Sequence, residues 1–185
     1  MLDAEQRAEL LSVARRRLER HFDSGQPSVE VSDPALLRPA GAFVSLHRRA
    51  PTAGAPRLRG CIGTFEERDP LVDTVERMTI AAATQDPRFS AVRAEELTEL
   101  AIEISVLSPR RRVSAEEVVV GRHGVFITLG SRRGVLLPQV ATEHGWDRQT
   151  FLEHTCQKAG LPRDTWRDAQ TQIEVFSAQV FGEAH

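Results

Sequence analysis

Two short apolar segments on either side of a Pro- and Gly-rich stretch constrain the fold most. Residues 42–47 and 58–65 both have strand character, and residues 48–56 between them carry two prolines and one glycine. Strands joined by so short a connection pair antiparallel, because a parallel pair needs a crossover of about a dozen residues or more. The sequence therefore predicts a hairpin with an exposed loop at 48–56. This pairing brings His47 within a few residues of Cys61, although the register is not fixed by the sequence.

The other expected elements alternate between helices and hairpin strands. Asp3 is expected to cap a helix that runs to about residue 22, and the Asp69-Pro70 pair to open a second helix. Further strands are expected at 101–107, at 125–129 and 135–137 around a polar turn, and as one long closing strand at 172–181; another helix follows Asp147. Strands that come mainly as hairpins predict the α+β class, with a mainly antiparallel sheet flanked by helices.

Composition excludes several classes of protein. With 24 basic and 26 acidic residues the net charge is -2, and aromatic residues make up only 5% of the 185, with no Tyr. A strong attraction to nucleic acid or to an anionic membrane is therefore not expected, nor are base-stacking platforms. The chain lacks an apolar run of the roughly 18 residues that span a membrane, and it begins with a polar, acidic segment. We therefore expect a cytoplasmic protein whose two cysteines are free thiols, although spacing alone leaves a Cys61–Cys156 disulfide open.

The segment Leu58-Arg59-Gly60-Cys61-Ile62-Gly63-Thr64-Phe65 carries the strongest chemical signal. An arginine and backbone amides near a cysteine favour the reactive thiolate form, and glycines in a strand allow a substrate or another backbone to approach closely. The alternative is structural: a free cysteine is often a small buried apolar residue, and the glycines could mark a β-bulge.

This octapeptide resembles the hallmark of the AMMECR1-domain family, whose prokaryotic members are often called AmmeMemoRadiSam system protein A. Other segments resemble the family in the same order along the chain: 86–89, 123–124, 136–141, 145–147, 151–152 and 156–161. The resemblance implies that residues 1–185 form a single AMMECR1 domain with a larger and a smaller subdomain, which meet at a cleft near residues 58–65. It also implies a functional link to a Memo-like protein and a radical S-adenosylmethionine (SAM) protein, and it brings no settled activity.

The candidate site residues follow from what a cysteine nucleophile needs. It needs a base, for which His47 and His123 are candidates, while Glu103 and Asp86 could orient that base or handle protons. The predicted catalytic residues are Cys61, His123, Glu103 and Asp86, and the predicted substrate-binding residues are Arg59, Gly60, Gly63, Thr64, Arg88 and Gln139. Each has a structural alternative: a surface or packing role for the histidines, a solvent-facing strand position for Glu103, and an ion pair with Asp86 or Glu95 for Arg88.

Motifs for cofactors are missing. The six histidines form no H-x-x-x-H and the cysteines no C-x-x-C, so neither a metal nor another cofactor is predicted; nucleotide-binding glycine patterns and G-x-S-x-G are also missing. Because the chain has no cysteine cluster, radical SAM chemistry must belong to another protein. The leading hypothesis is an enzyme in which Cys61 acts on an anionic small molecule. The alternatives are a non-catalytic adaptor that binds a Memo-like partner and, more weakly supported, an RNA-binding protein.

Overall fold

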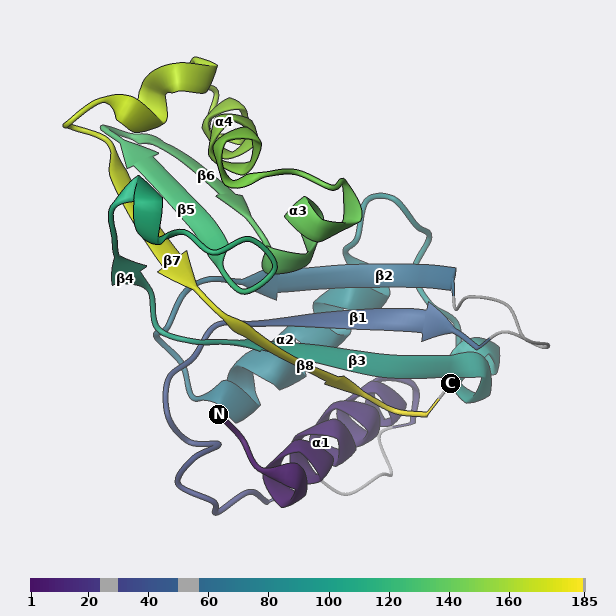
Figure 1. The fold of residues 1–185 in the computed structure, drawn as a ribbon. Helices are drawn as coiled ribbons and strands as arrows, with labels where there is room; N and C mark the ends of the chain where they lie inside the picture. Colours follow the sequence, from purple (N-terminus) through teal and green to yellow (C-terminus); the bar gives the residue numbers. More distant parts are fainter. Residues whose placement is uncertain (24–29, 50–56, 185) are drawn as a thin grey trace. The chain divides into compact units, whose positions relative to one another are not determined.

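The computed structural model describes residues 1–23, 30–49 and 57–184, which form two compact units. The first unit comprises residues 1–107 and the segment that follows residue 178, and the second comprises residues 108–178. Each unit has its own four-stranded sheet, in the order β2-β1-β3-β8 in the first and β4-β7-β5-β6 in the second (Figure 1). The predicted α+β class with mainly antiparallel strands is confirmed, but the strands form two sheets.

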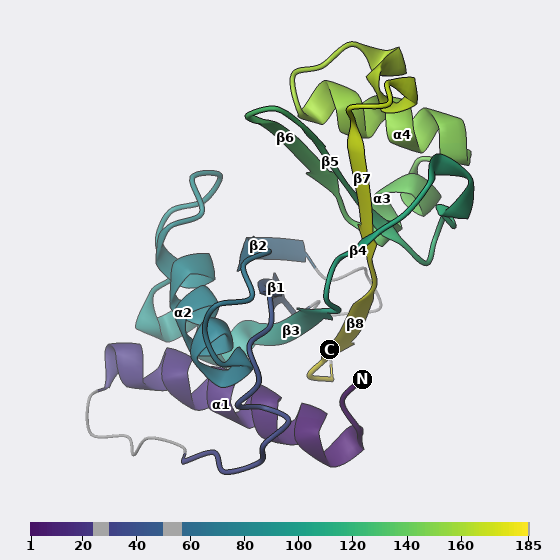
Figure 2. The ribbon, with the colours of Figure 1, turned by 90° about the vertical axis from the view of Figure 1, so that its left-hand side faces the viewer.

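The first unit places two helices on one face of its sheet (Figure 2). The elements are α1 (Ala4–Phe22), β1 (Ala42–Arg48), β2 (Arg57–Thr64), α2 (Leu71–Thr84), a 3₁₀ helix (Ala94–Glu99), β3 (Leu100–Leu107) and β8 (Ala178–Gly182). Alternate residues of β1, namely Ala42, Val44 and Leu46, are buried among side chains of α1 and α2. Because successive strand residues point to opposite faces, Phe43, Ser45 and His47 lie on the face away from these helices.

The helix boundaries follow from local chemistry. Asp3 caps α1 as predicted: its side chain accepts a hydrogen bond from the amide of Gln6, whose side chain in turn accepts from the Asp3 amide. α2 begins directly after the Asp69-Pro70 pair, as predicted, but Pro70 rather than Asp69 holds the N-cap position, and Asp69 pairs with Arg77. The expected hairpin loop at 48–56 lies outside the described residues from position 50 onward.

In the second unit, helices pack on the sheet around Phe151, Leu152 and Cys156. Its elements are β4 (Arg111–Arg112), a 3₁₀ turn (Ala115–Glu117), β5 (Gly124–Leu129), β6 (Arg132–Leu136), α3 (Pro138–Glu143), α4 (Arg148–Lys158), a 3₁₀ helix (Arg163–Arg167) and β7 (Gln172–Phe176). Asp147 caps α4 as predicted, through a hydrogen bond from the amide of Thr150. Pro138, expected only to end the hairpin, also begins α3, since proline suits the first turn of a helix.

The predicted long closing strand at 172–181 is wrong. It is two strands, β7 and β8, which belong to different sheets and are separated at Ser177. The Ser177 amide donates a hydrogen bond to the Ser108 hydroxyl, and the Ser177 carbonyl accepts one from the Ser108 amide. The chain therefore leaves the second sheet where the two serines pair. Across the described ranges, no helix combines the length and apolar character needed to cross a membrane.

Candidate functional site

Three polar side chains lie in one row on the face of the first sheet that points away from α1 and α2. In the register of the strands, Ser45 of β1 is directly opposite Cys61 of β2 on one side and Glu103 of β3 on the other. Residues directly opposite one another share a face, so all three lie on the face away from α1 and α2. Cys61 is partly exposed, and both cysteines are free thiols.

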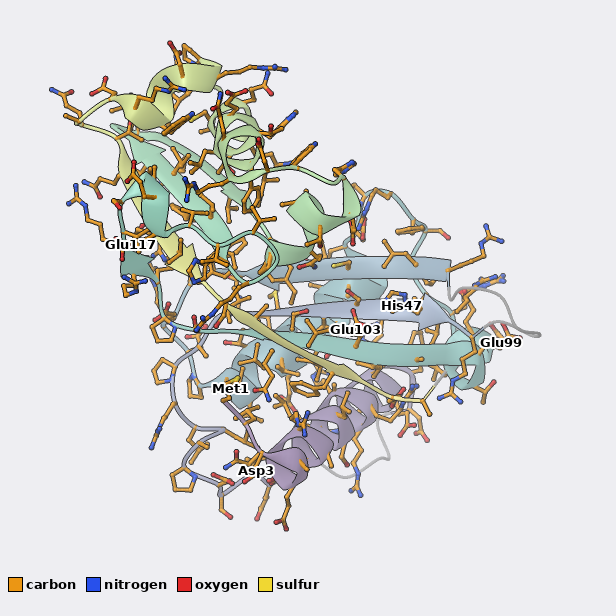
Figure 3. The ribbon with its side chains drawn as sticks, in the orientation of Figure 1. Met1, Asp3, His47, Glu99, Glu103 and Glu117 are labelled. Carbon is orange, nitrogen blue, oxygen red and sulfur yellow. The ribbon has the colours of Figure 1, made fainter. Side chains whose placement is uncertain are left out.

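His47 lies one step along the same face, next to Glu103. Its Nε2 atom is 3.8 Å from Oε1 of Glu103, and Figure 3 shows the two residues on the neighbouring strands β1 and β3. His47 is also the diagonal neighbour of Cys61, because it is two residues beyond Ser45. Diagonal pairs have Cα atoms about 7–8 Å apart, which long side chains can span. A thiol, an imidazole and a carboxylate therefore occupy neighbouring positions on one face.

Asp86 anchors the opposite edge of β2. β2 is an edge strand, so amides on its outer side have no strand partner, and Asp86 Oδ2 accepts a hydrogen bond of 2.9 Å from the amide of Cys61. The same carboxylate accepts two hydrogen bonds from the Arg88 guanidinium, of 3.0 Å from Nε and 2.7 Å from Nη2. Asp86 is buried, whereas the side chain of Arg88 is 55% exposed. The ion pair expected for Arg88 is thus present, and it holds a solvent-accessible guanidinium beside the Cys61 backbone.

The charges of this pair stabilise each other. Hydrogen bonds from the Arg88 side chain hold the pKa of Asp86 well below its usual range, helped by the amides of Cys61 and Arg88 and opposed by burial. The Asp86 carboxylate in turn raises the pKa of Arg88, and the charge of a Cys61 thiolate contributes in the same direction. Arg88 and the Cys61 amide therefore donate to the same carboxylate.

We expect Asp86→Asn to lower the free energy of unfolding at neutral pH by about 1.5–3 kcal/mol, the range for buried hydrogen bonds to a charged group. Because the pKa of Asp86 is lowered on folding, its contribution is present above its unfolded pKa of about 3.9 and is lost as the pH falls below it. Urea denaturation of the wild type and of Asp86→Asn, at neutral and at acidic pH, measures the difference in the free energy of unfolding. The exposed Asp73→Asn is the control; an equal loss in the two variants, or a difference independent of pH, would contradict the assignment.

Arg59 is directed into the first unit by a β-bulge. The register passes from Leu46 opposite Gly60 to His47 opposite Leu58, so Arg59 is the extra residue, and a bulge changes the direction of a side chain. Its guanidinium is buried and binds both carboxylate oxygens of Glu96, at 2.9 and 3.0 Å, together with the carbonyls of Ser90 and Ala91. The donors of Arg59 are used within the protein, so its predicted role as a substrate clamp has no support in these contacts.

Packing explains both glycines of the octapeptide. A Cβ atom on Gly60 would lie 2.1 Å from the carbonyl oxygen of Ala82 in α2, and one on Gly63 would lie 2.1 Å from the ring of Phe43. Gly60 thus serves the close approach of another backbone, one of the two roles predicted for it. Thr64 ends β2, and its hydroxyl accepts a hydrogen bond from the amide of Glu66.

Two predicted residues belong to the second unit and are described within it. Nδ1 of His123 accepts a hydrogen bond from the amide of Val119, and burial, with Arg122 and Arg111, lowers the pKa of its imidazole. Gln139 is exposed in the first turn of α3, and its carbonyl accepts from the Thr142 hydroxyl. The contacts of the first unit join Cys61, Asp86 and Arg88, while a role for His123 or Gln139 with Cys61 stays a prediction.

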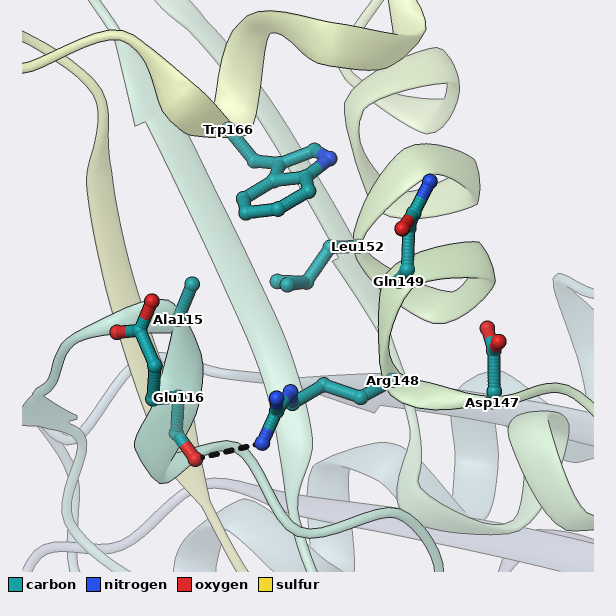
Figure 4. A pocket seen from close by; sticks show the side chains of 7 residues that line it. All are labelled: Ala115, Glu116, Asp147, Arg148, Gln149, Leu152 and Trp166. Carbon is teal, nitrogen blue, oxygen red and sulfur yellow. Dashed lines mark hydrogen bonds between the residues drawn. The ribbon is translucent and has the colours of Figure 1, made fainter.

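The second unit also has a surface hollow of about 340 Å³ beside the start of α4 (Figure 4). Trp166 and Leu152 form its apolar floor, and Arg148 closes one side by donating a hydrogen bond of 2.8 Å to the carbonyl of Glu116. The residues that line it include none of the predicted site residues. The hydrogen bond from Arg148 links the 3₁₀ turn at 115–117 to the start of α4.

Sequence reasoning missed Ser45 and Glu96. Ser45 became relevant only through the register, which places it between Cys61 and Glu103. Glu96 is buried against Arg59, although it belongs to an acidic segment of the kind usually exposed to solvent. The capping pattern of its 3₁₀ helix, in which the Glu96 side chain accepts from the Arg93 amide, was the available signal.

Comparison with known proteins agrees with the resemblance noted from the octapeptide. The AMMECR1 family model matches residues 11–181. A protein of Thermococcus gammatolerans is 42% identical over 185 residues, covering 95% of this chain and 89% of its own, and protein MK0488 of Methanopyrus kandleri is 41% identical, covering 94% and 86%. The crystal structure of the uncharacterized protein PH0010 from Pyrococcus horikoshii superposes with a TM-score of 0.78 at 39% identity, covering 95% of this chain and 90% of that one. On this evidence the chain belongs to the AMMECR1 family.

Proposed function

We propose that the first unit carries a reactive thiol, Cys61, that acts on an anionic small molecule. The observation that carries this proposal is the row on the sheet face away from α1 and α2, in which Ser45 separates Cys61 from Glu103 and His47 is the diagonal neighbour of both. A nucleophilic cysteine requires a base, and the base requires an orienting group. These three residue types occur here at neighbouring positions of adjacent strands.

Each side chain has a defined role in this proposal. The Cys61 thiol transfers its proton to the His47 imidazole, and the sulfur electron pair forms a bond to a carbonyl carbon while the carbonyl π electrons move to oxygen. Glu103, 3.8 Å from His47 Nε2, orients the imidazole. Arg88, held by Asp86 and half exposed, binds the negative group of the substrate. His123 and Gln139 remain candidates for a contribution from the second unit.

The family resemblance suggests the cellular setting of this chemistry. It implies that the protein works with a Memo-like protein and a radical SAM protein. This chain has only two cysteines, one in each unit, so an iron–sulfur cluster would have to reside in the partner. In this setting Cys61 would receive its substrate from, or pass its product to, a partner enzyme.

A second function, a non-catalytic adaptor for a Memo-like partner, is favoured by a different observation. Gly60 and Gly63 are accounted for by contacts with Ala82 and Phe43, and Arg59 by its pair with Glu96. Much of the octapeptide thus builds the first unit whether or not Cys61 reacts. In this alternative, Cys61 is a packing residue and the protein serves recognition.

The reactivity of Cys61 distinguishes the catalytic function from the adaptor function, and Cys156 serves as an internal standard. Cys61 is partly exposed and Cys156 is fully buried, and burial raises the pKa of the Cys156 thiol. With limiting iodoacetamide at neutral pH, mass spectrometry should find Cys61 alkylated and Cys156 unmodified. His47→Gln should slow the alkylation of Cys61 by about tenfold or more, whereas His21→Gln, a change at an exposed histidine of the same unit, should not. Alkylation of Cys61 only under unfolding conditions would end the catalytic proposal.

Replacement of Cys61 by serine separates chemistry from binding. We expect Cys61→Ser to fold normally, to bind the Memo-like partner as the wild type does, and to fail to complement a strain that lacks the gene. Complementation at the wild-type level would instead support the adaptor. Pull-down with the purified partner and a growth assay in the deletion strain provide the two measurements.

A further inference from the structure

A second polar site in the first unit lies at the other end of β2 from Thr64. It is a hollow of about 540 Å³, and its lining consists of three arginines, one glutamate and three residues of the segment that follows Arg88: Arg48, Arg59, Arg93, Glu96, Phe89, Ser90 and Ala91. A volume of this size falls within the range of about 300–1,000 Å³ typical of small-molecule sites. Cys61, His47 and Glu103 are not among the residues that line it.

The single carboxylate of the hollow, that of Glu96, is neutralised by the buried guanidinium of Arg59. Glu96 accepts two hydrogen bonds from Arg59, and the side chains of both residues are 9% exposed. These bonds, together with those from Arg48 and the Arg93 amide, lower the pKa of Glu96 to about 2, so it is fully ionised at neutral pH. Two further N–H groups of the Arg59 guanidinium donate to the carbonyls of Ser90 and Ala91. Arg59 and Glu96 therefore form a rigid, neutral floor.

Two guanidinium groups remain above this floor. Arg48 touches Glu96 through Nη2, yet its side chain is 49% exposed. Arg93 is exposed, and its backbone amide donates a hydrogen bond of 3.1 Å to Glu96 Oε1. Among the described residues, its guanidinium has no carboxylate partner. Three arginines against one glutamate leave two positive charges in the lining. Paired guanidinium donors match the oxygens of a phosphate group.

We propose that this hollow binds the phosphate group of a small phosphorylated molecule through Arg48 and Arg93. Glu96 holds the Arg48 guanidinium through Nη2 and the Arg93 backbone through its amide, so the Arg93 side chain extends from an anchored position. Phe89 supplies an apolar wall for the remainder of the ligand. Recognition of an anion at this hollow is independent of whether Cys61 is reactive.

Calorimetric titration with inorganic phosphate at neutral pH tests the proposal. The wild type should show saturable one-site binding, and Arg93→Gln should weaken it by about tenfold or more, the effect of losing one charged hydrogen-bonding group. Arg16→Gln is the matched control, because Arg16 is an exposed arginine of α1 in the same unit and its replacement changes the net charge equally. Arg48→Gln should weaken binding as well, and circular dichroism establishes that each variant is folded.

Two results would overturn the site. One is equal phosphate affinity in Arg93→Gln and Arg16→Gln, and the other is a wild-type response that sodium chloride reproduces at the same ionic strength. The Cys61→Ser variant separates this site from the thiol: it should bind phosphate like the wild type. Failure of phosphate binding with a reactive Cys61 would remove only the hollow, whereas an inert Cys61 with intact phosphate binding would remove only the thiol chemistry.

Discussion

Glu96→Gln should lower the free energy of unfolding by about 3–5 kcal/mol at neutral pH, the cost of leaving a buried charge without its partner. Arg59 is 7% exposed, and its guanidinium is held by both oxygens of Glu96. A neutral amide keeps the shape of the side chain but leaves the guanidinium charge buried and uncompensated. Chemical denaturation monitored by circular dichroism measures the loss.

An exposed ion pair of the same unit provides the comparison. Asp69 and Arg77 lie 2.7 Å apart with 52% of each side chain exposed, so Asp69→Asn should cost less than about 1 kcal/mol. Equal losses of unfolding free energy in Glu96→Gln and Asp69→Asn would show that the buried pair stabilises the protein no more than the exposed one. The pKa of Glu96 is lowered on folding from 4.5 to about 2, so its contribution is complete above pH 4.5 and disappears as the pH falls toward 2.

The double variant Arg59→Met with Glu96→Leu refines this prediction. It removes both buried charges, and apolar replacements of a buried ion pair are often close to neutral. The carbonyls of Ser90 and Ala91 lose their donor, so we expect recovery of part of the stability lost in Glu96→Gln. A double variant less stable than Glu96→Gln would indicate that the hydrogen bonds to these carbonyls outweigh the charge.

Gly60→Ala should destabilise the protein by about 3 kcal/mol or more, near the upper end for overpacked sites. The new methyl group would lie 2.1 Å from the carbonyl oxygen of Ala82, which is backbone in the last turn of α2. No side-chain rotation can relieve this contact, so strand β2 and helix α2 have to separate. Thermal and urea denaturation report the change.

Gly63→Ala is the matched variant, because its clash is with a side chain. The methyl group would meet the ring of Phe43, which is partly exposed. Phe43→Leu in the background of Gly63→Ala should therefore restore part of the stability, while the same change in the background of Gly60→Ala should not. Restoration in both backgrounds, or in neither, would contradict the packing explanation of the two glycines.

Short-range signals in the sequence located most of the secondary structure. Asp3 and Asp147 each cap the helix that the sequence assigned to them, because a capping side chain acts within three residues. The fold class also followed, since strands in hairpins pair antiparallel. The error at 172–181 had a different origin: nothing local distinguishes a strand that leaves one sheet for another from a continuous strand, because both are extended.

For the candidate site, the sequence by itself determined which chemical groups are present: a thiol among glycines, an Asp86–Arg88 pair two residues apart, and a mainly antiparallel scaffold. Only the tertiary structure decided how they are used. The β-bulge at Arg59 directs its side chain to the buried Glu96, and the register places Ser45 between Cys61 and Glu103. Register and bulges depend on the packing of α2 against β2 and on the pairing of distant residues such as Ala42 and Val106, and such long-range contacts leave no local pattern to be read.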